Sequence, residues 1–228
     1  MSEEADNMPE QVSGPPRRRQ RRKEARPSEI VEAALELFAE RGFGATRMED
    51  VARRAGVAKG TLFVYFPTKQ DLFRAVARTI TAGNLERLQA IASNLERPIV
   101  EVIPALLAHA AIIAETRVPS LIRLLISESR LFPDLARVWH DEVVSNVLGL
   151  LTSAIERAQE RGELHDGDPQ LIAFSIIGPM FSGLIFREVM SGVDAELPDL
   201  QKLAAQHAQV ILRGLVKEAR PEEAQRRS

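Results

Sequence analysis

The chain contains no cysteine among its 228 residues, only one tryptophan and one tyrosine, and a formal net charge of just −2. Without cysteine it forms neither disulfides nor thiolate metal sites. Its four histidines are scattered along the sequence and lack the close spacing of metal ligands. We therefore expect no metal site and no cofactor.

Long hydrophobic runs are also missing. The longest run without a charged or amide side chain, Leu171–Phe186, has 16 residues and contains the pair Gly178 and Pro179. A membrane-spanning helix needs about 20 predominantly apolar residues. The amino terminus is acidic and then arginine-rich, without the apolar segment of a signal peptide. We expect a buried helix here, no membrane partner and a cytoplasmic protein.

Signatures of catalysis are missing as well. The sequence has no recognisable nucleophile–base pair, glycine-rich phosphate loop or coenzyme fingerprint. The segment Gly56–Gly60 has two glycines and a lysine, but it is too short for a phosphate-binding loop. We predict that the protein is not an enzyme.

Charge is distributed unevenly along the chain. Residues 1–75 contain 14 Lys and Arg against 12 Asp and Glu, whereas residues 76–228 contain 16 against 20. The asymmetry is mild, and it is consistent with an amino-terminal region that faces DNA.

Helical periodicity recurs along the chain, with no extended strand-like alternation. Glycines and prolines mark the helix boundaries, and Pro104 should kink or restart the helix that contains it. The sequence predicts an all-α protein of about nine helices joined by short loops. The predicted helices cover about residues 28–41, 47–55, 59–66, 68–92, 98–116, 119–132, 133–161, 169–191 and 198–219.

Four regions follow from this pattern. Residues 1–27 are predicted to be a disordered basic arm, and residues 220–228 a flexible tail. Residues 28–75 are predicted to form an amino-terminal domain of three helices, and residues 76–219 a larger helical bundle. The arm either contacts DNA phosphates or the minor groove, or is a solvated tail. Its basic residues are Arg17, Arg18, Arg19, Arg21, Arg22 and Lys23.

The most informative segment runs from Thr46 to Phe66. Thr46 and Glu49 have the spacing of a capping box, and a helix of one apolar face follows. Gly56 can end that helix with a positive φ, and Leu62 and Phe66 on the next helix point inward. Two short helices around a tight turn indicate a helix-turn-helix. The apolar face of the first helix contains Met48, Val51, Ala52 and Ala55.

The sequence VARRAGVAKGTLFVYFPTKQDLF in this segment resembles the DNA-binding signature of the TetR family of transcriptional regulators. The resemblance extends from about Arg26 to about Val76. A second resemblance, carried by RLLISESRLFPDLARVWHDEVV and Asp168-Pro169, is to the carboxyl-terminal domain of the AefR-like subgroup, within the AcrR/AefR-like regulators. Together they imply that residues 28–75 are a DNA-binding domain and that residues 76–219 are a ligand-binding and dimerisation domain.

The resemblance implies which residues contact double-stranded DNA. The second helix of the motif would read the major groove, with Gly60 allowing close approach of the backbone. Phe63 stands where the family usually has tyrosine, and Ala58 where it often has serine or threonine, so we expect weaker phosphate anchoring there. The expected DNA-contacting residues are Thr46, Arg47, Lys59, Gly60, Thr61, Phe63, Tyr65 and Lys69.

The resemblance also implies a homodimer, because the last two helices of the family pair with those of a second copy. The helix at 169–191 is apolar nearly all round, which is unusual for a surface helix. A helix buried within one protomer is the alternative. The expected dimer residues are Ile177, Phe181, Leu184, Ile185, Leu203, Val210 and Ile211, with Gly178 and Gly183 allowing close helix contact.

A small-molecule cavity is the third implication, and the sequence favours an apolar or amphipathic effector. Candidate lining residues are Leu107, Ala111, Leu125, Glu128, Trp139, Val143, Phe174 and Met180, each of which could instead be ordinary core. Polar residues on apolar faces are further candidates because burying them is costly without a partner. These are His109, Arg123, Glu128, Asn146 and Ser175.

The predicted function is that of a dimeric repressor on a palindromic operator, released by the effector. A ligand-independent or activating regulator of the same fold is the alternative. A helical carrier or scaffold that does not bind DNA is a third possibility, which a mobility-shift assay separates from the other two.

Overall fold

The computed structural model describes residues 17–92 and 97–217, with side chains from Pro27 onward. Within these ranges it contains ten α-helices, one π-helix and no strand beyond an isolated bridge between Leu164 and Val216. The elements are α1 (Arg17–Ala45), α2 (Met48–Arg54), α3 (Lys59–Tyr65), α4 (Lys69–Ala92), α5 (Ile99–Ile113), α6 (Val118–Glu128), α7 (Pro133–Trp139), η1 (His140–Val144), α8 (Ser145–Glu160), α9 (Pro169–Met190) and α10 (Leu200–Leu215). The predicted all-α fold is confirmed.

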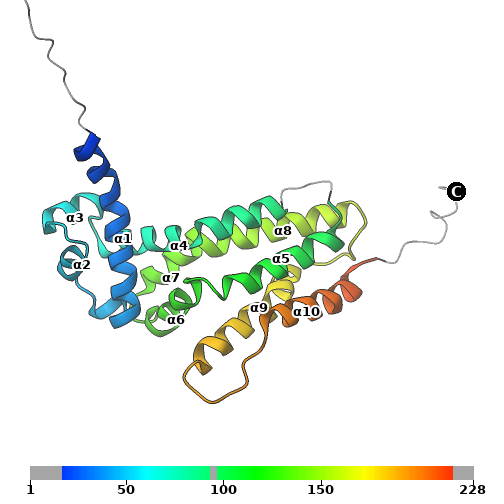
Figure 1. The fold of residues 1–228 in the computed structure, drawn as a ribbon. Coiled ribbons are helices and arrows are strands. Elements are labelled where there is room, and N and C mark those ends of the chain that lie inside the picture. Colours follow the sequence, from blue (N-terminus) through cyan, green and yellow to red (C-terminus); the bar gives the residue numbers. More distant parts are fainter. Residues whose placement is uncertain (1–16, 93–96, 218–228) are drawn as a thin grey trace, which may run out of the picture.

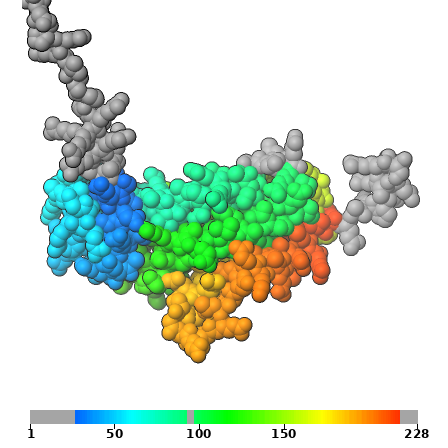
Figure 2. All heavy atoms as spheres, viewed as in Figure 1, coloured from blue at the N-terminus to red at the C-terminus, as the bar shows by residue number. Residues whose placement is uncertain are grey.

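The molecule is elongated, with two parts that α4 connects (Figure 1). Helices α1, α2 and α3 form a head at one end, and α5 to α10 form the body. The carboxyl-terminal half of α9 and the loop after it project from the side of the body (Figure 2).

Helix α1 is longer than the sequence analysis predicted. It begins at Arg17 rather than near Ser28, and Pro27 lies inside it. Arginine, glutamine, lysine and glutamate favour helices even without an apolar face, which explains the difference. The basic residues from position 17 onward therefore lie on a helix and not in a disordered arm. Residues 1–16 of the predicted arm, and the predicted tail, lie outside the described residues.

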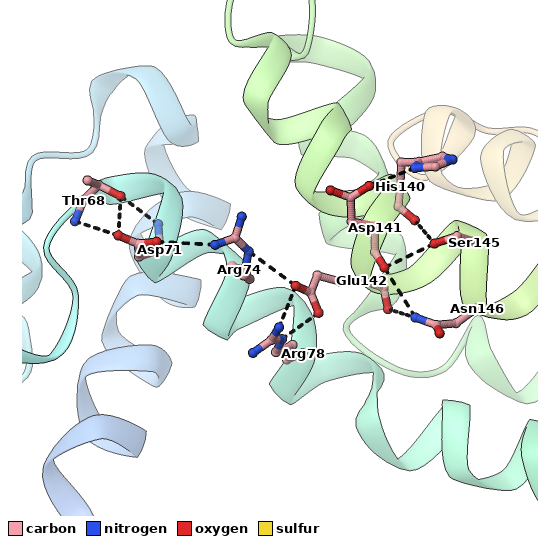
Figure 3. A network of polar contacts seen from close by, with 9 residues as sticks. All are labelled: Thr68, Asp71, Arg74, Arg78, His140, Asp141, Glu142, Ser145 and Asn146. Carbon is pink, nitrogen blue, oxygen red and sulfur yellow. Dashed lines mark hydrogen bonds and ion pairs between the residues drawn. The ribbon is translucent and has the colours of Figure 1, made fainter.

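Glycine and capping residues set the helix ends of the head. Gly42, with φ +82°, interrupts α1 at its predicted end, and Gly56, with φ +65°, forms the turn after α2. The capping box at the start of α4 is confirmed: the Thr68 hydroxyl accepts from the Asp71 amide at 3.0 Å, and Asp71 Oδ2 accepts from the Thr68 amide at 3.2 Å (Figure 3).

The capping box predicted for α2 is wrong. Arg47 is the N-cap of α2, and no side-chain hydrogen bond to this cap is present in the described part of the chain. Thr46 is buried, and its hydroxyl donates backward to the carbonyls of Gly42 at 2.7 Å and Leu37 at 3.1 Å. Thr46 therefore stabilises the end of α1.

The helix predicted over residues 133–161 is three elements. The π-helix η1 separates α7 from α8, so that one predicted helix corresponds to α7, η1 and α8. Single π-helical turns inside α-helices are frequent at functional sites. In α5, the helix continues through Pro104 from Ile99 to Ile113, rather than restarting there.

Two hydrophobic cores hold the fold. The first joins the head to α4, α6 and α7: Phe38, Phe43 and Phe73 pack against one another, and Leu121 and Leu135 belong to the same cluster. The second core lies in the body, among α4, α5, α6, α8, α9 and α10. The head thus shares its interior with two helices of the body.

Helix α9 is long and apolar enough to cross a membrane by length and composition alone, with a mean hydropathy of 1.6 over its most apolar window. It packs against α5, α6, α8 and α10. Its N-cap is Asp168, which accepts from the amides of Gln170 and Leu171, as predicted. Ala173, Ile176 and Met180 are buried in the body core.

Candidate nucleic-acid interface and ligand cavity

Helix α3 has one buried side and one open side. Leu62 is fully buried and Phe66 nearly so, as the pattern predicted. Phe63 is 37% exposed and Val64 80% exposed. A methyl group added at Gly60 would meet no atom of the described chain within 4 Å. Gly60, Phe63 and Val64 recur at i, i+3 and i+4, so they share one face, which we call the reading face.

Lys59 begins α3 beside the reading face. Its Nζ lies 2.6 Å from Glu49 Oε1 and 5.9 Å from the ring centroid of Phe63. The hydrogen bond from Lys59 lowers the pKa of the Glu49 carboxyl below its ordinary value. The lysine predicted to contact DNA is therefore paired with a carboxylate across the helix-turn-helix, where it must be released to reach a phosphate or base.

The other predicted DNA residues divide into two groups. Arg47 is exposed at the start of α2, and Thr61 and Tyr65 are half-buried on α3, where Tyr65 packs against the head core. Thr46 and Lys69 are used inside the protein. The Thr46 hydroxyl bonds to α1 carbonyls, so the prediction that it donates to phosphate does not fit this structure.

Lys69 lies where the head meets the body. Its Nζ is 4.4 Å from the ring centroid of Phe43 and donates to the Gly44 carbonyl at 3.3 Å. Burial lowers the pKa of the Lys69 ammonium below its ordinary value, although the nearby Glu128 carboxylate raises it. A free phosphate clamp would be fully solvated, so this geometry gives Lys69 a structural contact as well.

Glu128 at the end of α6 binds the last residues of α1, beyond the break at Gly42. Its two carboxylate oxygens accept from the amides of Phe43 at 2.8 Å and Gly44 at 2.6 Å. The Phe132 ring packs on Phe43 with centroids 5.3 Å apart. A Cβ at Gly42 would lie 2.1 Å from Glu128 Oε1, so only glycine fits there. We call this contact the head–body joint, and it corrects the prediction that Glu128 binds the effector.

A second contact connects α4 to η1, as Figure 3 shows. Glu142 accepts from Arg78 Nε at 2.6 Å and from Arg78 Nη2 at 2.8 Å, and it lies 3.3 Å from Arg74 Nε. Arg74 also lies 3.4 Å from Asp71 of the α4 capping box. We call this set the α4 clasp, because it holds the helix that leads into the head against the π-helix.

A cavity of about 340 Å³ lies in the body, between α4, α5, α6, α7, η1, α8 and α9. Every lining residue within the described ranges is apolar or glycine. The lining consists of Leu88, Leu106, Leu107, Ala110, Ile113, Val118, Ile122, Trp139, Val143, Val144, Val147, Leu148, Leu151, Phe174, Ile176, Ile177, Gly178, Met180, Phe181 and Leu184. Such a wall can bind a ligand through apolar contact and offers it no charged partner.

The predicted apolar candidates fit this cavity better than the polar ones. Trp139 and Phe174 line it, as do Leu107, Val143 and Met180, whereas Ala111 and Leu125 do not.

The polar candidates bond elsewhere, because each finds a partner in the protein. His109 Nε2 lies 3.1 Å from the Asn84 carbonyl, and Arg123 lies 2.9 Å from Glu188. Asn146 donates to the Glu142 carbonyl at 3.0 Å, and Ser175 donates to the Leu171 carbonyl. None of these four is among the lining residues described above.

The residues predicted for the dimer are placed unequally. Phe181 is 51% exposed and Val210 61% exposed, whereas Leu184 is buried and lines the cavity. A Cβ at Gly183 would lie within 3.0 Å of Leu200 and Leu203, so this glycine allows close contact between α9 and α10 of one protomer. Four further predicted residues, Ile177, Ile185, Leu203 and Ile211, are half-buried and pack against the body core.

Several residues with a place in these sites carried no signal in the sequence. Val64 is the most exposed large apolar residue of α3, yet the resemblance assigned it no role. The ion pairs of Glu49 with Lys59, and of Glu142 with Arg74 and Arg78, were not predicted, because local spacing does not show which residues pair between helices. Only the i, i+4 relation of Gly60 and Val64 could have identified one of them.

The second helix of the motif, α3, presents an open reading face and is supported by the core of α1, α2 and α3. This arrangement is typical of a helix-turn-helix regulator. Residues 30–76 match the bacterial regulatory proteins of the TetR family, and residues 105–213 match the C-terminal domain of AefR-like transcriptional repressors. The chain belongs to the TetR family of transcriptional regulators, as the sequence predicted.

Individual relatives agree with this assignment. The HTH-type transcriptional regulator RutR of Escherichia coli (strain K12) is 31% identical over 173 residues, covering 70% of this chain and 74% of RutR. A TetR-family regulator from Mesorhizobium loti MAFF303099 has a TM-score of 0.72 at 22% identity, covering 86% of this chain and 99% of its own. The complex of Stenotrophomonas maltophilia SmeT with triclosan has a TM-score of 0.70 at 22% identity, covering 86% and 93%.

Proposed function

We propose that this protein is a cytoplasmic, dimeric repressor that binds a palindromic operator and is released by an uncharged apolar effector. The observation that carries the proposal is the reading face of α3, where an open glycine lies between an exposed lysine and exposed apolar side chains. Family membership supports DNA binding, and the dimer, the operator symmetry and the effector are our inferences.

On DNA, α3 would lie in the major groove, which admits one helix. Gly60 lets the backbone approach the bases closely. Phe63 and Val64 are suited to contact thymine methyl groups, which apolar side chains read. Lys59, once released from Glu49, and Arg47 at the start of α2 would contact phosphates or guanine.

A dimer is favoured by the apolar surface of α9 and α10. Leu171, Phe174, Phe181 and Val189 follow one side of α9 and are half or more exposed, and Val210 of α10 is 61% exposed. Exposed apolar side chains on two helices in contact are typical of an interaction site. One small DNA-binding module buries little surface, so two heads related by a two-fold axis would supply the specificity. We call these five residues the dimer face.

The effector would occupy the cavity of the body. Its volume of about 340 Å³ lies in the range of small-molecule sites. Its apolar wall would impose a desolvation cost on a charged ligand without offering a partner, which favours an uncharged one. The similar SmeT structure is a complex with triclosan, so a small molecule occupies this fold there.

Release would pass through the α4 clasp. Val143 and Val144 line the cavity, and Glu142, the residue before them, holds Arg74 and Arg78 of α4. A ligand that displaces η1 would therefore move α4, and α4 supplies Phe73 to the head core. Two heads displaced in this way would no longer match their half-sites.

A mobility-shift and footprinting experiment with the DNA upstream of the gene tests the proposal. We expect a protected inverted repeat, and at least tenfold weaker binding by Lys59→Ala. Lys202→Ala on α10 is a matched control, because Lys202 is also exposed and paired at 3.7 Å with an acidic residue, yet lies far along the chain from α3. Unchanged binding by Lys59→Ala would refute the assignment of Lys59. No specific shift at all would favour a carrier or scaffold.

In vitro transcription from the same fragment separates repression from activation. We expect the protein to reduce transcript from the promoter that overlaps the footprint. An increase would select the activating alternative.

A further inference from the structure

The cavity and the dimer face share residues. Phe174 and Phe181 line the cavity, yet they are 50% and 51% exposed, so they form its rim as well as its wall. Both also belong to the dimer face, on the same side of α9 as Leu171 and Val189. The mouth of the cavity therefore opens beside the surface that we expect a second copy to cover.

We propose that the second copy of this chain closes the mouth of the cavity, so that the complete site for an uncharged apolar ligand exists only in the dimer. The inference rests on the dimer in the proposed function, and it goes further by making the partner part of the ligand site. Two half-exposed phenylalanines are a poor wall for an apolar ligand in water, because ligand and rim both stay hydrated. A second apolar surface over Phe174 and Phe181 would remove both from water.

In this arrangement, ligand binding and dimerisation are thermodynamically coupled. If the dimer binds the ligand more tightly than the monomer does, the ligand must strengthen dimerisation by the same factor for each bound molecule. The effector would then release the protein from DNA as an intact dimer.

The test uses a dimer-face residue that does not line the cavity. Val210 lies on α10 and is absent from the lining described above, so Val210→Glu should oppose dimerisation and leave the cavity wall unchanged. Leu131→Glu is the matched control, because Leu131 is 77% exposed, follows α6 and belongs to neither α9 nor α10. Sedimentation velocity gives the oligomeric state of each variant, and circular dichroism shows that it is folded.

Two readouts then report on closure. The first is binding of N-phenyl-1-naphthylamine, an uncharged apolar fluorescent probe, for which we expect at least tenfold weaker affinity in the Val210→Glu monomer. The second is acrylamide quenching of Trp139, the single tryptophan of the chain, which lines the cavity. We expect its quenching constant to rise at least twofold in the monomer, whereas Leu131→Glu should match the wild type in both readouts.

The outcomes separate this inference from the proposal on which it rests. A wild-type protein that is monomeric at micromolar concentration refutes the proposed dimer. A dimeric wild type and a folded Val210→Glu monomer with equal probe affinity and equal Trp139 quenching refute the closure alone. If Val210→Glu stays dimeric or does not fold, quenching of wild-type Trp139 is followed over dilution through the dimer dissociation range, where unchanged quenching is the refuting result.

Discussion

In the head, Phe38 packs against Phe43 and Phe73 with ring centroids 5.3 and 6.2 Å apart, whereas the body contains a cavity of about 340 Å³ among its helices. Close packing gives one arrangement of the head, because any shift produces overlap or a void. The helices that line the cavity have free space on one side, so they can move at a lower cost in free energy. In the proposed function, we therefore expect the head to move as a rigid unit and the conformational change to begin in the body.

Adding volume to each region tests this comparison most directly. Ala34 of α1 is fully buried in the head core, and Ala110 of α5 lines the cavity. Because both positions are helical and leucine and alanine have similar helix propensities, the two Ala→Leu substitutions differ mainly in the space around them. We expect Ala34→Leu to lower the free energy of unfolding by about 2–3 kcal/mol, and Ala110→Leu to change it by less than about 1 kcal/mol.

Urea denaturation measures both variants, and binding of N-phenyl-1-naphthylamine should weaken in Ala110→Leu alone. Equal destabilisation of the two variants would show that the cavity is not available to new side-chain atoms.

The head–body joint shows how firmly the two regions are connected. Glu128→Ala removes the acceptor of the Phe43 and Gly44 amides, and the Phe43 amide belongs to a buried residue. We expect a loss of about 1–2 kcal/mol in the free energy of unfolding, since unpaired buried donors are costly. Glu128→Gln keeps one acceptor oxygen and should lose about half as much. If both variants unfold like the wild type, the joint does not hold the head.

At the reading face, one substitution should raise folding stability and lower operator affinity. Gly60→Ala adds a methyl group in open space, and so does Gly83→Ala on the exposed part of α4. Each should stabilise the protein by about 0.5–1 kcal/mol, because alanine favours helices over glycine. Gly60→Ala alone should weaken operator binding, by roughly tenfold, since its methyl group would meet the DNA. Thermal denaturation and fluorescence anisotropy with operator DNA measure the two effects, and normal binding by Gly60→Ala would place α3 outside the groove.

The same comparison explains what the sequence could predict. The inward and outward sides of α3 follow from local spacing, as do the caps at Thr68 and Asp168. The resemblance identified the family whose models match residues 30–76 and 105–213. Local spacing does not show how distant helices meet, and the functions assigned to Thr46 and Glu128 depend on such contacts.

The polar residues of the body illustrate the same limit. His109 and Arg123 stood out because they interrupt apolar faces, but each bonds to a partner that only the folded chain brings close. The π-helix η1 was also beyond prediction, since one extra residue in a turn leaves the apolar pattern almost unchanged.

The α4 clasp should contribute more to orientation than to stability. Its arginines are 41% and 65% exposed, and exposed ion pairs contribute little to folding. We expect Glu142→Gln to leave the free energy of unfolding within about 1 kcal/mol, and to weaken operator binding roughly threefold to fivefold because the heads are held less firmly. Asp134→Asn removes an ion pair within α7 and serves as the control. Operator binding at wild-type strength in Glu142→Gln would mean that the clasp does not set the position of α4.

The smallest expected effect concerns the head itself, where Lys59 of α3 is paired with Glu49 of α2. Glu49→Gln removes the carboxylate that holds Lys59 at 2.6 Å, so both the competition for the lysine and one negative charge near the DNA disappear. We expect affinity for operator and for unrelated duplex DNA to rise together, by roughly twofold to threefold, since phosphate contacts carry no sequence information. Glu160→Gln on α8 is the control for charge alone.

The pKa of Glu49 lies below its ordinary value, so Glu49 stays ionised from about pH 6 to pH 8 and the effect of Glu49→Gln should be constant over that range. Anisotropy titrations at several salt concentrations measure it. A gain for the operator alone would contradict this account, because it would mean that Glu49 selects among sequences rather than restraining the lysine that contacts all of them.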